Sequence, residues 1–481
     1  MIILISKSVE ENKESLKKLF HNTSDLVLYE FETLSNDRAL VVYIDGIVDE
    51  FRLNEDLLKP LIKDLVSPWD IKSTVYISET NEVKNIQEMT MPIFQGNVVL
   101  FIEGLDLAYI FNLAQWPKRS VEQPTIERVA MGPKESFVED IIVNKTLIRR
   151  RIMNNDLVFE DCILGKQTNT MVNLVYIDGI VKEEVLEELR NRIEEIQGDA
   201  ILSTGYIEQY IDKYSNKLIS TVGFTERPDT VAGKILEGCI AIISDGSPIA
   251  LTVPKLFIEN LHTSEDYYVK PTFATFLRIL RFIAFFLSFT LPGIYISLIL
   301  YHPAMVPTEL LLSIAGQREG VPFASFFETF ILVIFFDLVK EAGIRLPQAI
   351  GETVTLVGGL VIGQAAVTAG LASATMVIIV AAAGITEFVV PKLRQSIPIL
   401  RIIFLFLGTI LGLYGISLGL VFLFVHLVSI NSFGVPYMWP ITPYDKEGMK
   451  DTIIKYSLKK DNFRPNVIDK DNAQRRDDRI E

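Results

Sequence analysis

The hexapeptide YIDGIV occurs twice in the 481-residue chain, at residues 43–48 and again at 176–181. Each copy closes an apolar, β-branched run, ALVVYIDGIV and MVNLVYIDGIV, and Asp-Gly is a usual sequence where a strand enters a turn. A Glu- and Leu-rich segment of helical period follows each copy, NEDLLKPLIKDLV and EEVLEELRNRIEEI. The sequence therefore predicts a unit of strand, turn and helix that is present twice.

A second repeated strand lies downstream in each copy. GNVVLFIEG at 96–104 and GCIAIISDG at 238–246 both place an apolar run between glycines. We therefore expect an α/β soluble N-terminal half made of two tandem homologous subdomains, at residues 1–130 and 131–272. Near-continuous apolar strands that alternate with helices favour a helix-covered sheet with parallel or mixed strands. The Asp-Gly turns are interpreted as structural, because these residues are common in turns.

The remainder of the chain has long stretches without charge. Residues 282–301, 353–386 and 402–444 contain no Asp, Glu, Lys or Arg, and a membrane-spanning helix needs roughly 20 largely apolar residues. We therefore predict an all-α polytopic transmembrane C-terminal half, with four to six membrane helices at 273–433 and a polar tail at 434–481. The first twenty residues lack the basic region and cleavage site of a secretory signal, so the soluble half is expected to be cytosolic.

Composition excludes several classes of function. The formal net charge of -14 argues against nucleic-acid binding, which needs a basic face. The two cysteines and four histidines show no metal-ligand spacing, so no metal and no cofactor are expected. Phosphate-binding and nucleophile motifs are absent, so we expect no catalytic residues and no enzyme. The basic cluster at 149–151 is interpreted as a solvated helix face, with docking to a neighbour or to anionic headgroups as the alternative.

One apolar segment has two different faces. Small residues that allow close helix packing recur along one side: Gly359, Gly363, Ala366 and Gly370. Another side, at steps of three or four, carries Thr353, Val357, Val361, Gln364 and Thr368. The second stripe suits a helix that lines a narrow pathway, with valines that close it by dewetting and polar groups that meet an ion. Hydrogen bonding between helices of a packed bundle is the alternative.

Three acidic residues lie within or beside the apolar segments: Glu328, Asp337 and Glu387. A charge in hydrocarbon costs at least about 3 kcal/mol, so these membrane-embedded acids must face water, protein or headgroups. For Glu387 we favour a snorkelling or paired carboxylate over a proton relay. Arg278 and Arg281 open the first span and fit the basic cytoplasmic flank of a membrane helix.

Several long motifs, in order along nearly the whole chain, carry a family resemblance. They include HPAMVPTELLLSIAGQREGVPFASFFE, EAGIRLPQAIGETVTLVGGLVIGQAAVTAGL and SINSFGVPYMWPITP, with IRRRI, GYIEQYI, TERPD and NFRPN. These segments resemble the A subunit of GerA-type spore germinant receptors. The resemblance implies a protein of the spore inner membrane of endospore-forming bacteria that acts with a multispan B subunit and a lipoprotein C subunit. It further implies a homo-oligomer, expected to be a pentamer, that forms a nutrient-gated ion channel and starts germination.

With this resemblance, the stripe from Thr353 to Thr368 becomes the preferred pore face. A non-conducting scaffold or signalling subunit of the same receptor is the main alternative. A secondary transporter is less favoured, because the chain lacks repeat-related broken helices. The sequence leaves open the germinant, the permeating ion, the number of spans, the copy number and the side on which the tail lies.

Overall fold

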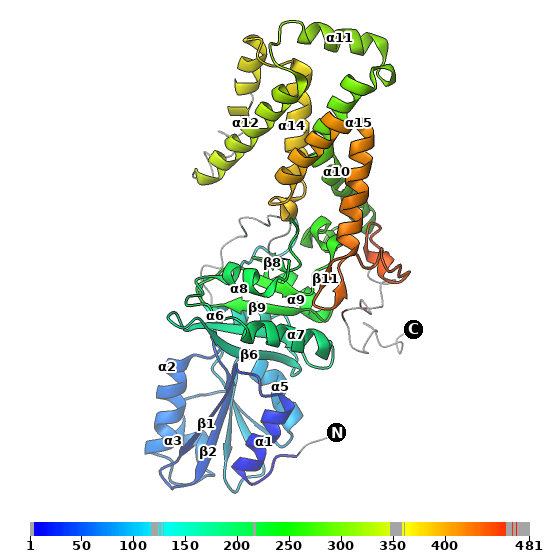
Figure 1. Cartoon of the computed structure of the whole chain (residues 1–481). Helices are drawn as coiled ribbons and strands as arrows, with labels where there is room; N and C mark the ends of the chain where they lie inside the picture. Colours follow the sequence, from blue (N-terminus) through cyan, green and yellow to red (C-terminus); the bar gives the residue numbers. More distant parts are fainter. Residues whose placement is uncertain are drawn as a thin grey trace.

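The computed structural model describes residues 4–116, 124, 127, 129–214, 218–346, 358–359, 361–457, 464 and 468. Two β-sheets lie at one end of the molecule and a bundle of helices lies at the other (Figure 1). The second sheet lies between the first sheet and the helices. The soluble and helical halves expected from the sequence are therefore both present.

The first subdomain is a five-stranded sheet with the order β1-β2-β4-β5-β3. Its strands are β1 (Leu26–Glu32), β2 (Arg38–Ile44), β3 (Thr80–Val83), β4 (Asn97–Ile102) and β5 (Ala108–Asn112). Its helices are α1 (Val9–Leu19), α2 (Glu50–Arg52), α3 (Lys59–Lys63), α4 (Ile71–Thr74) and α5 (Ile86–Phe94). A π-helical stretch, Leu53–Leu58, joins α2 to α3.

The second subdomain repeats this arrangement, with the sheet order β6-β7-β9-β10-β8. Its strands are β6 (Leu157–Leu164), β7 (Thr170–Ile177), β8 (Gly223–Thr225), β9 (Ile240–Ser244) and β10 (Ala250–Val253). Its helices are α6 (Ile141–Arg149), α7 (Glu183–Glu194), α8 (Thr204–Ile211) and α9 (Pro228–Leu236). The two YIDGIV segments begin in the equivalent strands β2 and β7, so the predicted tandem homologous subdomains are confirmed.

The direction of the strands differs from the prediction. Every strand pair in the described part of both sheets is antiparallel, so the expectation of parallel or mixed strands was wrong. Helices stand on both sides of the first sheet (Figure 1), and the central strands β2 and β4 are buried almost throughout. Burial on both faces removes the apolar-polar alternation that usually marks antiparallel strands.

The helical half contains α10 (Pro271–Tyr301), α11 (Thr308–Arg318), α12 (Ser325–Arg345), α14 (Ala374–Phe388) and α15 (Ile397–Val428). Residues 361–368 are also helical. In the described part of the chain, α10 and α15 are the two helices long and apolar enough to cross a membrane. The chain turns inside α15, where Gly412 has φ 62° and ψ -149°, and α15 forms two arms in Figure 1. This left-handed backbone conformation favours glycine.

Glycines allow α10 and α15 to approach closely. A Cβ added at Gly408 would lie 2.5 Å from the carbonyl oxygen of Gly293. One turn from this contact, the rings of Phe289 and Phe404 meet edge to face with centroids 4.9 Å apart. Gly408 thus lets α15 pack directly against the backbone of α10.

The chain returns to the second subdomain after α15. A hairpin of β11 (Asn431–Ser432) and β12 (Val435–Pro436) leads to Tyr437 and Trp439, which are buried in the same core as β7 and β9. Ser432 Oγ donates to the carbonyl of Thr221 at 2.8 Å. The described residues after α15 therefore lie at the same end of the bundle as the soluble half (Figure 1).

Candidate functional site

The helical residues 361–368 contact little of their own chain. Val361 is 57% exposed, and Gln364 and Thr368, on the same stripe, are also exposed. Gly363 is buried, and a Cβ there would lie 3.0 Å from Val377 Cγ1 of α14. The described part of the predicted pore stripe is therefore exposed in the monomer. Thr353 and Val357, the other two candidates, lie outside the described residues.

The predicted packing residues differ in their surroundings. A Cβ at Gly359 would meet no atom within 4 Å, whereas the one at Gly363 would touch α14. Ala366 is half-buried. Gly370 has φ +69° and follows the last helical residues, as is common where a helix ends. Gly363 is thus the member of the stripe in closest contact with a neighbouring helix.

Glu328 binds the start of α14. Its side chain is fully buried, and its Oε1 accepts hydrogen bonds from Ser373 N and Ser373 Oγ, both at 2.7 Å. Gln317 makes a similar contact, since its Oε1 accepts from Thr375 N at 3.2 Å and from Thr375 Oγ1 at 2.8 Å. Arg318 Nε lies 3.8 Å from Glu328 Oε2. A carboxylate at a helix N-terminus is stabilised by the backbone N–H groups and by the helix dipole.

Asp337 and Glu387 belong to one buried charge network with Lys340 and Arg401. Lys340 Nζ lies 2.5 Å from Glu387 Oε1 and 3.5 Å from Asp337 Oδ1. Arg401 Nη2 lies 2.6 Å from Glu387 Oε2, and Arg401 Nη1 lies 3.2 Å from Asp337 Oδ1. Arg401 Nε also donates to the carbonyl of Ser288 at 2.8 Å. Two acids and two bases thus connect α10, α12, α14 and α15, and the network has no net charge.

Sequence reasoning predicted that these acids need partners but did not find the partners. Lys340 and Arg401 are visible in the sequence as charges next to apolar segments. Arg401 is fully buried, and a buried guanidinium requires acceptors. Matching such bases to the nearby acids is the signal that could have identified the network.

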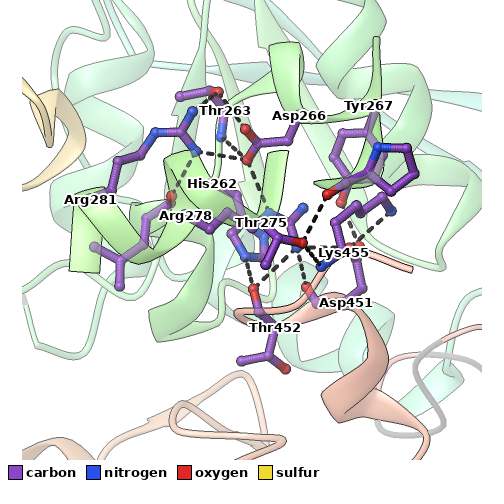
Figure 2. Close-up of polar contacts among 12 residues, drawn as sticks. His262, Thr263, Asp266, Tyr267, Thr275, Arg278, Arg281, Asp451, Thr452 and Lys455 are labelled. Atoms are coloured by element: carbon purple, nitrogen blue, oxygen red, sulfur yellow. Dashed lines mark hydrogen bonds and ion pairs between the residues drawn. The ribbon is translucent and has the colours of Figure 1, made fainter. Parts of the chain in front are cut away.

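A second buried network lies where the second subdomain meets α10 (Figure 2). Arg278 and Arg281, interpreted as membrane flank, are both almost fully buried and both bond Asp266. Arg278 also bonds Asp451, which comes from the segment after α15. Neither acid was predicted. Asp266 lies in a polar segment without periodicity, and Asp451 lies far from the arginines in sequence.

Arg149 joins the two subdomains. Its Nε and Nη2 donate to the two carboxylate oxygens of Asp25 at 2.8 and 2.9 Å. The guanidinium lies between the rings of Phe94 and Phe159, at 5.4 and 5.1 Å from their centroids. Arg150, by contrast, is exposed, with 54% of its side chain accessible. The predicted solvated face therefore holds for Arg150 but is wrong for Arg149, because Asp25 and two rings supply a complete buried site.

A cavity of about 470 Å³ lies beside the network of Figure 2, and His262 and Tyr267 line it. Its walls carry charges of both signs, and Lys234 Nζ and Glu259 Oε1 form an ion pair at 2.5 Å. Burial and the charge of Arg278 lower the pKa of His262 to about 3, so this imidazole is neutral. In the described part of the chain, no group of three His, Cys, Asp or Glu side chains could hold a metal ion.

Comparisons with known proteins place the chain among its relatives. The profile of the family described as "Bacillus/Clostridium GerA spore germination protein" matches residues 14–467. The chain is 38% identical to spore germination protein KA of Bacillus subtilis (strain 168), over 98% of this chain and 89% of that protein. It is 34% identical to spore germination protein A1 of the same organism, over 95% and 93% of the two chains.

A solved structure also shows similarity. The crystal structure of the N-terminal domain of the A subunit of the Bacillus megaterium spore germinant receptor GerK3 is 29% identical in sequence. The match covers 53% of this chain and 98% of that domain, with a TM-score of 0.41. The profile match and the identity over almost the whole length of these relatives show that the chain belongs to the GerA family of spore germination proteins.

Proposed function

We propose that this protein is the A subunit of a nutrient receptor in the spore inner membrane, and that several copies form a nutrient-gated ion channel. In this proposal residues 1–130 and 131–272 are cytosolic subdomains, 273–433 is the transmembrane domain, and 434–481 is the tail. A multispan B subunit and a lipoprotein C subunit are the partners. Family membership supports the role in germination, and the exposed helix at 361–368 supports the channel.

The exposure of Val361, Gln364 and Thr368 is the observation that carries the channel proposal. A helix that packs on its own chain chiefly through Gly363 leaves most of its surface for other contacts. In a ring of copies, the apolar sides of this helix can pack on neighbours while the polar stripe faces the axis. Gln364 then meets permeating ions, and Val361 closes the path by dewetting when the valines approach one another.

Ion flux through reconstituted protein tests this proposal. Purified oligomers in liposomes are expected to pass monovalent cations, and Val361→Ala is expected to raise the resting leak at least about tenfold, because a smaller side chain weakens a dewetted gate. Ile378→Val in α14 is a matched control, since Ile378 is also exposed, at 66%, and lies outside the stripe. The channel proposal would be contradicted if liposomes with the wild-type protein and liposomes with Val361→Ala both passed no cations. A chain that remains monomeric would also contradict it.

A scaffold without a path of its own is the second candidate. Thr368 Oγ1 already donates to the carbonyl of Gln364 at 2.8 Å, so this hydroxyl has a partner within the helix. In a scaffold the same stripe packs against other subunits. Substitutions along the stripe would then reduce co-purification with the partner subunits and leave ion flux unchanged.

A further inference from the structure

The contact between the second subdomain and α10 is built around two carboxylates, one fully buried and one with 24% of its side chain exposed. Asp266 follows the second sheet, and its side chain is fully buried. Its Oδ2 accepts from Arg278 Nε at 3.2 Å and from Arg281 Nη1 at 2.8 Å. Asp266 also bonds Thr263 at the start of its own 3-10 turn. Asp266 thus holds the connector between the second sheet and α10 in two ways. It bonds Thr263 within the connector, and it bonds two arginines of α10.

Asp451 adds the segment that follows α15 to the same site (Figure 2). Arg278 Nη1 donates to Asp451 Oδ1 and to the Asp451 carbonyl, both at 2.9 Å, and to the Thr452 carbonyl at 3.1 Å. Tyr267 Oη donates to Asp451 Oδ2 at 2.7 Å. Arg278 of α10 therefore bonds two other parts of the chain at once: the connector after the second sheet and the returning C-terminal segment.

Further bonds close the site around this arginine. His262 Nε2 donates to the Thr452 carbonyl at 2.6 Å, and Lys455 N donates to Thr275 Oγ1 at 3.0 Å. Lys455 Nζ lies 2.9 Å from Asp451 Oδ1. We call this set of residues the joint; its members are His262, Thr263, Asp266, Tyr267, Thr275, Arg278, Arg281, Asp451, Thr452 and Lys455.

The charges make the joint act as a unit. Arg281 and Arg278 lower the pKa of Asp266, and Arg278 and Lys455 lower the pKa of Asp451, so both acids are ionised. A buried charge whose partner is removed is left uncompensated. Loosening one member therefore disturbs its neighbours as well, and the joint is expected to be rigid.

The joint is continuous with the charge network of the helical bundle. Beyond Arg281, α10 packs on α15 and reaches Ser288, whose carbonyl accepts from Arg401. Arg401 pairs with Glu387 of α14 and Asp337 of α12. Building on the proposed function, we propose that the joint is a rigid coupling that transmits displacement of the second subdomain through α10 and Arg401 to α14 and α12. Asp451 is a positioning residue for α10 in this coupling.

Hydrogen exchange of the purified full-length chain tests the coupling. Asp451→Asn keeps the size of the side chain but removes its charge, so Arg278 loses one of its two ionic partners and keeps Asp266. Backbone amides at 271–281 and 448–457 are expected to exchange at least about tenfold faster, and increases are also expected near Arg401 and Glu387. Asp451→Glu keeps the charge and should restore most of the protection.

Glu447→Gln supplies the matched control. Glu447 is an acid in the same segment, but 40% of its side chain is exposed and it pairs with Lys450, so exchange at 271–281 should not change. Acceleration confined to 448–457 in Asp451→Asn would overturn the coupling. This measurement needs neither nutrient nor conduction, so its failure is distinct from failure of the channel proposal.

A germination assay completes the test. Spores that carry Asp451→Asn, with the variant protein present at the normal level, are expected to respond to a nutrient broth at least about tenfold more slowly, and spores with Glu447→Gln at the normal rate. Asp451→Glu should return the response toward normal, because it keeps the charge that pairs with Arg278. A normal response with Asp451→Asn would overturn the proposed transmission.

Discussion

Arg149 provides the sharpest prediction for a single residue. Its bidentate pair with Asp25 is buried on both sides, so Arg149→Leu leaves a carboxylate without a partner. The substitution is expected to lower the free energy of unfolding of the soluble half by about 3–5 kcal/mol. Arg150→Ala, which removes an exposed neighbour, should cost less than about 1 kcal/mol. Urea unfolding of the full chain, followed by circular dichroism, distinguishes them, and equal effects would contradict the buried pair.

His262 gives a prediction for pH. Its folded pKa of about 3 is below the ordinary value of 6.5, so the unfolded chain binds the proton more readily. The contribution of neutral His262 to the free energy of unfolding is therefore fully present above about pH 6.5. It is lost progressively as the pH falls from 6.5 toward 3. His262→Gln can still donate to Thr452 but cannot titrate. Melting temperatures between pH 7 and pH 5 should fall less in this variant than in the wild type; equal slopes would show that His262 does not carry the dependence.

For single residues, the sequence indicated which charges need partners but did not identify those partners. The sequence singles out the acids Glu328, Asp337 and Glu387 as charges that hydrocarbon would not tolerate, and this stays a prediction. Their contacts with Ser373, Lys340 and Arg401 depend on how helices far apart in sequence pack together. Spacing along one helix carries no information on that packing.

The close crossing of α10 and α15 gives a prediction for helices. Gly408→Leu would place side-chain atoms against the backbone of Gly293, since even a Cβ lies 2.5 Å from its carbonyl oxygen. We expect the helices to separate and the detergent-purified chain to lose about 3 kcal/mol of stability, the upper end of the usual cost of an overpacked contact. Gly316→Ala in α11, where a Cβ would meet no atom within 4 Å, is the control. Similar melting temperatures for both variants would refute the contact.

For predicting strands and helices, the sequence repeats were more informative than the pattern of apolar and polar residues. The two copies of YIDGIV correctly predicted two equivalent strands, because duplicated sequence preserves its place in the fold. The same strands misled the prediction of direction, since β2 and β4 are covered on both faces and read like parallel strands. The turn within α15 at Gly412 was also missed, because an apolar run of that length reads as one continuous helix.

For the molecule as a whole, the turn in α15 determines on which side of the helical bundle the segment after α15 lies. Its second arm returns to the second subdomain, and the hairpin after it buries Tyr437 and Trp439 there. Charge counts could not settle this topology, because the basic residues that suggest a flank, Arg278 and Arg281, are buried in the joint. The result is a soluble half, a first membrane-length helix and a C-terminal segment that share the joint.

The channel proposal makes its most direct prediction for water access to one helix. Single cysteines at Val361, Gln364 and Thr368 in reconstituted oligomers should react with a small, membrane-impermeant thiol reagent, and cysteine at Ile378 should react far more slowly. Burial raises the pKa of the native thiol of Cys162 to about 12, and Cys239 is buried, so the background reaction is slow. Labelling of the three stripe positions, at least about tenfold faster than at Ile378, is the result we predict. Cysteines at the three stripe positions that do not react with the reagent, either before or after addition of nutrient, would contradict the account.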